Sequence, residues 1–135
     1  MNTLSSVVVK TNSLKAVFGQ TETACVVRDN TIDLHLKIPT FSREQTEYLI
    51  SDRPGRIYQK LGFDLLETED TLAGVLVRDA QFPLESTTYA IYLNFLELTQ
   101  DWNLLRVWNY VPYINEDTDN LENYRSFCKG RSLAF

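Results

Sequence analysis

Apolar and polar residues alternate along several short stretches of the first forty residues, which predicts β-strands at residues 7–10, 23–28 and 31–38. In the third stretch, the branched apolar side chains fall on one face, and the opposite face, with Asp33, His35 and Lys37, is expected to be solvated. Because Asp and Asn tolerate left-handed backbone angles, residues 28–30 predict a hairpin turn between the second and third strands.

The middle of the chain contains further strand signals. Residues 44–51 fit a short helix or a strand, and Thr46, Tyr48 and Ile50 favour the strand. Residues 52–56 contain Pro54 and Gly55, so a loop is expected there. Residues 63–66 and 71–78 flank an acidic turn and predict a second hairpin.

The period changes to that of a helix after Pro83, and residues 84–99 predict an amphipathic helix. A strand is expected at residues 104–111. A last helix is expected from a cap at Asp119 or Asn120 to about residue 129, ended by Gly130, with Leu121, Tyr124 and Cys128 on its stripe. This order of elements predicts an α+β fold, a mixed β-sheet with two helices packed on one face.

Composition narrows the classes of function. A chain of 135 residues suits a single domain, and a net charge of −5 argues against nucleic-acid or anionic-membrane binding. Since the chain has no long apolar run or signal-peptide layout, we expect it to be cytoplasmic. One histidine excludes a multi-histidine metal site, and we expect no metal and no cofactor. Two buried thiols are favoured over a Cys25–Cys128 disulfide.

Two groups of side chains carry the most suggestive chemistry. Arg106, between aromatic residues on one face of the expected strand, fits a carboxylate whose ring stacks on Trp108 or Tyr110, although the same residues also suit a core or a subunit interface. Arg125, Lys129 and Arg131 gather at a helix C-terminus, where they either are solvated or clamp a dianion. The acids Glu67, Glu69 and Asp70 are expected to form a solvated loop.

Three motifs together resemble the chorismatase family. They are YLISDRP at 48–54, LRVWNYVPYIN at 105–115 and ENYRSFCKGR at 122–131. The resemblance covers residues 44–135, whereas residues 1–43 match only loosely. It implies a fold related to the RidA/YjgF superfamily and enzymes that convert chorismate to pyruvate plus hydroxybenzoate or dihydrodiol products.

The resemblance also implies that different parts of the family's chain have different functions. Members of the family are expected to be more than twice as long, with the catalytic acid in their later half, so no catalytic residue is assigned here. Chorismate is a dicarboxylate, and the matching residues that could bind it are Arg106, Trp108, Tyr124, Arg125 and Arg131.

The leading hypothesis is therefore a stand-alone homologue of the chorismatase N-terminal region, a ligand-binding or assembly subunit linked to chorismate or aromatic-acid metabolism. One alternative is a small chorismatase-like or RidA-like hydrolase with its site between identical subunits. Another is a structural interaction protein without a ligand. A sheet that stops after its last helix leaves an unpaired edge, so we expect a homo-oligomer or a partner protein to cover it.

Overall fold

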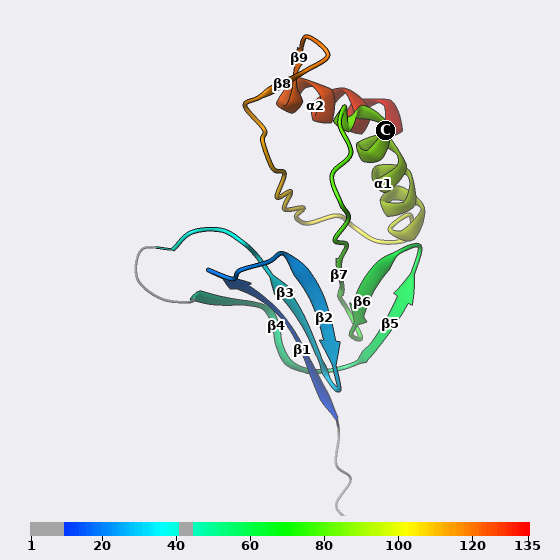
Figure 1. Ribbon diagram of the computed structural model, residues 1–135. Helices are drawn as coiled ribbons and strands as arrows, with labels where there is room; N and C mark the ends of the chain where they lie inside the picture. The colour runs from blue at the N-terminus through cyan, green and yellow to red at the C-terminus, as the bar shows by residue number, and fades with distance from the viewer. Residues whose placement is uncertain (1–9, 41–44) are drawn as a thin grey trace, which may run out of the picture. The chain divides into compact units, whose positions relative to one another are not determined.

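The computed structural model describes residues 10–40 and 45–135, and the chain divides into two compact units, residues 1–77 and residues 78–135. The strand expected at residues 7–10 falls almost entirely outside the described residues. The first unit contains the two larger β-sheets, and the second contains both helices and a two-stranded hairpin (Figure 1).

A four-stranded mixed sheet forms the larger part of the first unit. Its strands are β1 (Thr11–Phe18), β2 (Ala24–Arg28), β3 (Thr31–His35) and β4 (Gln45–Pro54), in the order β2-β3-β1-β4. β1 is parallel to β3, and the β2–β3 and β1–β4 pairs are antiparallel. The β2–β3 hairpin turns at Asp29, whose φ of 43° is left-handed, so the predicted hairpin is confirmed.

A three-stranded antiparallel sheet completes this unit. It consists of β5 (Arg56–Lys60), β6 (Phe63–Glu67) and β7 (Leu72–Val75), and β6–β7 is the predicted second hairpin. The two sheets share one core, because side chains from both pack into the same buried cluster: Leu14, Ile32, Ile50, Leu66 and Val75.

Two predictions in this unit are wrong. β1 was not expected, because its buried residues include the polar Asn12 and Ser13, which break the apolar alternation. Nor is there an open loop at residues 52–56, since β4 continues to Pro54 and β5 begins at Arg56. The buried Asn12 joins the two places: its Nδ2 donates to the carbonyl of Gly55, the residue between β4 and β5, at 2.9 Å.

The second unit is a pair of packed helices with a short hairpin. α1 (Leu84–Leu98) confirms the predicted amphipathic helix, and it packs on α2 (Asn123–Ala134). The hairpin strands β8 (Asp117–Thr118) and β9 (Leu121–Glu122) precede α2 (Figure 1). The core of this unit consists of buried Leu84, Tyr92 and Phe127.

The last helix differs from its prediction at both ends. Asp119 and Asn120 do not cap it, because their positive φ values of 52° and 65° form the β8–β9 turn. Gly130 does not end it either but lies buried within α2. The buried face is therefore not the expected stripe of Leu121, Tyr124 and Cys128; it consists of Asn123, Ser126, Phe127 and Gly130.

The strand expected at residues 104–111 is also absent: these residues form an irregular segment without a β-ladder. None of the backbone groups of residues 104–109 bonds to another backbone group within the described part of the chain. The side chains of Leu104 and Leu105 are 53% and 91% exposed. A strand needs a partner to complete its hydrogen bonds, and no partner strand lies beside this segment within residues 10–40 and 45–135.

The α+β class, with a mixed sheet and two helices, is confirmed. Packing of both helices on one face of the sheet, and the RidA/YjgF-like assignment, stay predictions. In the described residues, no helix combines the length and apolar character needed to cross a membrane.

Candidate functional site

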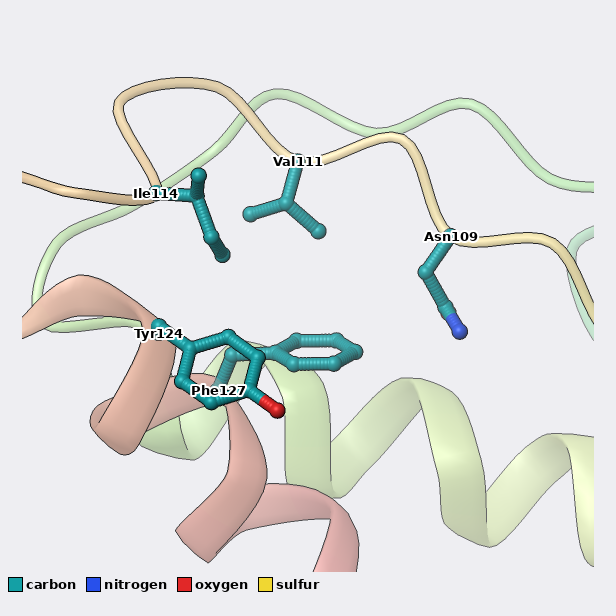
Figure 2. A pocket seen from close by; sticks show the side chains of 5 residues that line it. All are labelled: Asn109, Val111, Ile114, Tyr124 and Phe127. Carbon is teal, nitrogen blue, oxygen red and sulfur yellow. The ribbon is translucent and has the colours of Figure 1, made fainter.

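A pocket of about 250 Å³ lies in the second unit, between α2 and the segment before the β8–β9 hairpin. Figure 2 shows its two sides: Asn109, Val111 and Ile114 point from the segment toward the helices, and the rings of Tyr124 and Phe127 lie opposite them on α2. Sites for drug-sized ligands span about 300–1,000 Å³. This volume therefore suits a ligand with a single ring.

The apolar walls are fixed by the core of the unit. Phe127 is buried against Tyr92, with ring centroids 6.3 Å apart in an edge-on arrangement, and Val111 and Ile114 pack against the same cluster. The backbone N–H of Tyr124 donates to the Ile114 carbonyl at 2.9 Å, which joins the start of α2 to the segment. The pocket is thus bounded by side chains that the fold already holds in place.

Asn109 supplies one polar group of the pocket. Its Oδ1 accepts a hydrogen bond of 2.9 Å from the buried Tyr92 hydroxyl of α1. Sequence analysis missed Asn109 as a site residue. The signal was present, because Asn109 is the single amide on an otherwise apolar face of the expected strand, with Leu105, Val107 and Val111.

Tyr124 supplies the second polar group. A side-chain hydrogen bond with Cys128, one helical turn along α2, raises the pKa of Tyr124 above its ordinary value, and the charge of Arg131 partly opposes this shift. The phenol is therefore neutral at physiological pH. Arg131 also lies over the Phe127 ring, with the guanidinium carbon 5.5 Å from the ring centroid.

The structure brings together only some of the predicted site residues. Tyr124 lines the pocket, and Arg131 contacts its Phe127 wall. Arg106 stacks on Trp108, 5.3 Å from the ring centroid, but both side chains are exposed and neither lines the pocket. Arg125 is exposed on α2 and makes no ion pair with any described residue.

Other chemistry in the described residues is limited. No group of three or more His, Cys, Asp or Glu side chains is arranged to hold a metal ion in residues 10–40 and 45–135. Cys25 and Cys128 are free, partly buried thiols. Asp70 is exposed, as expected for the acidic loop, and its Oδ1 lies 3.1 Å from Arg53 Nη2. A polar depression at the start of α1 has no aromatic wall; it is lined by Arg78, Asp79, Gln81, Ser86, Thr87 and Ala90.

Comparison with known proteins places these features in a family. The family model described as "Chorismatase FkbO/Hyg5-like, N-terminal" matches residues 47–135. A chorismatase of Streptomyces hygroscopicus is 36% identical over 93 residues, which are 66% of this chain and 27% of the relative. A 3-hydroxybenzoate synthase of the same organism is 38% identical over 52 residues, 36% of this chain and 15% of the relative.

A solved structure extends the similarity to the fold. The crystal structure of a chorismatase at 1.08 Å resolution superposes with a TM-score of 0.80 and 31% identity, covering 92% of this chain and 39% of that one. This coverage exceeds what residues 44–135 provide, so it includes part of the N-terminal strands, which matched only loosely by sequence. The chain spans about a quarter of the first curated relative and well under half of the solved structure. On the family match over most of its length, this chain belongs to the FkbO/Hyg5-like chorismatase N-terminal family.

Proposed function

We propose that this domain is a ligand-binding unit for small planar aromatic carboxylates in chorismate-linked metabolism, and that it binds them in the pocket on α2. The observation that carries the proposal is the combination of Tyr124 and Phe127 as aromatic walls with the cation of Arg131 on the Phe127 ring. The names of the relatives, chorismatase and 3-hydroxybenzoate synthase, support the same class of ligand.

Charge supports the choice of an anionic ligand at this place. The chain as a whole carries −5, so an anion needs a local cation to bind. Arg131 is such a cation, because its charge acts on the Tyr124 hydroxyl. A guanidinium pairs with a carboxylate through charge-assisted hydrogen bonds, while the ligand ring is taken up by the aromatic and branched side chains.

Calorimetric titration with 3-hydroxybenzoate tests the proposal. The wild-type chain is expected to bind, and Arg131→Ala to weaken binding by about tenfold, the effect of losing one charge-assisted hydrogen bond. Arg125→Ala is the matched control, since it removes the same charge from an exposed position of the same helix, and Arg131, unlike Arg125, lies over the Phe127 wall of the pocket. Absence of wild-type binding, or equal losses in the two variants, contradicts the proposal.

We further propose that binding is not accompanied by turnover. Cleavage of an enol ether needs a general acid positioned at the ligand, and the residues that line this pocket are Asn109, Val111, Ile114, Tyr124 and Phe127, none of them a carboxylic acid. Incubation of the pure chain with chorismate is therefore expected to release no pyruvate above the spontaneous rate. Pyruvate formed at a rate proportional to protein concentration supports the alternative of a small hydrolase.

A role in assembly is a second candidate, favoured by the exposed segment 104–109. Its apolar side chains and unpaired backbone are a template for strand addition, and two copies of one segment can pair symmetrically. Light scattering over a range of concentrations is expected to show self-association that Leu105→Ser weakens. Leu133→Ser, at an exposed leucine of α2, is the control; a monomer at every concentration contradicts this role.

A further inference from the structure

The hydrogen bond between Tyr92 and Asn109 links the core of the helical unit to the pocket. Tyr92 is only 5% exposed, and its ring is held by edge-on contacts with Phe95 at 5.7 Å and Phe127 at 6.3 Å between centroids. Its hydroxyl is therefore a fixed donor. The Asn109 Oδ1 that accepts from it, at 2.9 Å, has a defined orientation in an otherwise irregular segment.

This bond decides which end of the Asn109 amide faces the pocket. A carboxamide has an acceptor oxygen and a donor nitrogen, and rotation by half a turn exchanges them. Because Oδ1 is engaged by Tyr92, Nδ2 remains for a ligand, and no described residue accepts a hydrogen bond from it. Figure 2 shows the Asn109 side chain, with its nitrogen at the tip, on the same side of the segment as Val111 and Ile114.

We propose that Asn109, oriented by Tyr92, is the residue that sets ligand specificity in this pocket: it selects ligands that bring a hydrogen-bond acceptor over those that bring only donors. The proposal rests on the proposed ligand-binding function and names the feature of the ligand that is recognised. Tyr92 is a positioning residue, since it acts on the ligand through Asn109.

The other lining residues do not provide this discrimination. Val111, Ile114 and Phe127 have no polar side-chain atom, and the Tyr124 hydroxyl both donates and accepts. Arg131 favours anions by its charge, so it distinguishes a carboxylate from an ammonium group. Its charge does not distinguish a neutral ligand that accepts hydrogen bonds from a neutral ligand that only donates them. Asn109 is exposed in the free chain, so its Nδ2 is hydrated until a ligand covers it. A bound ligand without an acceptor at this position leaves that donor unpaired and loses binding free energy.

The test compares two uncharged probes of similar size by calorimetric titration of the full chain at pH 7: acetophenone, whose carbonyl oxygen only accepts hydrogen bonds, and aniline, whose neutral amino group chiefly donates. The wild-type chain is expected to prefer acetophenone. Asn109→Asp replaces the donor by an acceptor, and it is expected to lower the acetophenone preference, measured as the ratio of the two Kd values, by at least about tenfold. Asn103→Asp makes the same change at an exposed position outside the pocket and is expected to alter the ratio less than about twofold.

A second variant tests the orientation by Tyr92. Tyr92→Phe keeps the buried ring but frees the amide to rotate, so benzoate binding is expected to weaken about threefold to tenfold. Benzamide, which pairs with either end of the Asn109 amide, is expected to change less than about twofold. Tyr89→Phe, an exposed tyrosine of the same helix, is the control. A structural effect of Tyr92→Phe alone would weaken both probes equally and overturn the proposal.

The outcomes separate this inference from the function on which it rests. If the wild-type chain binds neither 3-hydroxybenzoate nor benzoate, the proposed function fails. If it binds them and Asn109→Asp leaves the acetophenone-to-aniline ratio equal to that of Asn103→Asp, the ligand-binding function stands and the role of Asn109 is overturned. Circular dichroism of each variant establishes that the helical unit is folded.

Discussion

Gly130 of α2 lies directly against the backbone of α1 at Glu85. A Cβ atom added at Gly130 would come within 2.3 Å of the Glu85 carbonyl oxygen and 2.9 Å of the Thr88 Cβ. Real Cβ atoms do not approach a backbone oxygen so closely, and both partners belong to helices that cannot shift independently of the core. The glycine thus allows the two helices to come close enough to bury Phe127 between them and the pocket segment.

Gly130→Ala is therefore expected to destabilise the chain, by about 1–2 kcal/mol in urea unfolding, even though alanine is the better helix former. Ala90→Gly at an exposed position of α1 is the control: it is expected to cost about 1 kcal/mol, which shows that alanine is favourable in a helix where space is open. A Gly130→Ala chain as stable as the wild type would mean that the helices separate at no cost.

The same helix pair shows why local sequence signals predicted α1 correctly but placed the end of α2 wrongly. Pro83 and the helical period of the apolar residues after it identify α1 without any knowledge of its neighbours. Gly130 is a typical terminator in sequence, and only Glu85, forty-five positions away, shows that it is a packing residue. Local pattern therefore identified α1 and the β2–β3 hairpin, but it could not identify contacts between distant elements.

The strand predicted at residues 104–111 is absent for a different physical reason. Alternation of apolar and polar residues measures how well a segment would fit a half-buried sheet, and it does not supply the neighbouring strand. The same limitation affected the candidate site. Tyr124 and Arg131 were predicted as residue types in a motif. Asn109 stood out in sequence only as the one amide on an apolar face, and its bond with Tyr92 became visible in the structure. Arg106 and Trp108 were predicted for the site from their pattern, yet they form an exposed stacked pair.

Ser126 provides a second test of the helix pair. α1 has no side-chain cap of its own at Pro83, and the backbone N–H of Glu85 donates instead to the Ser126 Oγ of α2 at 3.0 Å. Ser126 is 1% exposed, so water does not replace it readily. Ser126→Ala is expected to cost about 1–2 kcal/mol in urea unfolding, as for the loss of a helix cap. Ser132→Ala, exposed on the same helix, is expected to change stability by less than about 0.5 kcal/mol.

The ionisation of Asp70 is expected to contribute to the pH dependence of the free energy of unfolding in acid. Hydrogen bonds from Thr71 and Thr68, with the charge of Arg53, lower the pKa of Asp70 below its usual value of 3.8. Because the pKa of the folded state is the lower one, the contribution is present above the unfolded value and is lost as pH falls through the folded value. Below about pH 4, Asp70→Asn is therefore expected to unfold with a flatter pH dependence than the wild type.

The measurement for Asp70 is urea unfolding at pH values between about 2.5 and 5, in steps of about half a pH unit. Asp101→Asn is the control, because it removes an exposed carboxylate at the end of α1 that has no ion pair among the described residues. Identical acid slopes for the wild type and Asp70→Asn would show that the loop interactions do not hold Asp70 ionised in solution.

The thiol of Cys25 is expected to react slowly with alkylating reagents. Burial, followed by a hydrogen bond with Asp64 and the charges of Asp64 and Asp33, raises its pKa from 9.0 to about 12. The thiolate is the reactive form of a cysteine. Because of the raised pKa, the thiolate population of Cys25 at pH 8 is about a thousandfold lower than that of an ordinary cysteine.

The experiment uses a Cys128→Ser chain, in which Cys25 is the remaining cysteine. Iodoacetamide is expected to label the native protein far more slowly than the urea-unfolded protein. Asp64→Asn, which removes one cause of the shift, is expected to speed native labelling, whereas Glu69→Gln, in the exposed acidic loop, is not. Rapid labelling of the native Cys128→Ser chain at pH 8 would contradict the burial of Cys25 against Asp64 between the two sheets of the first unit.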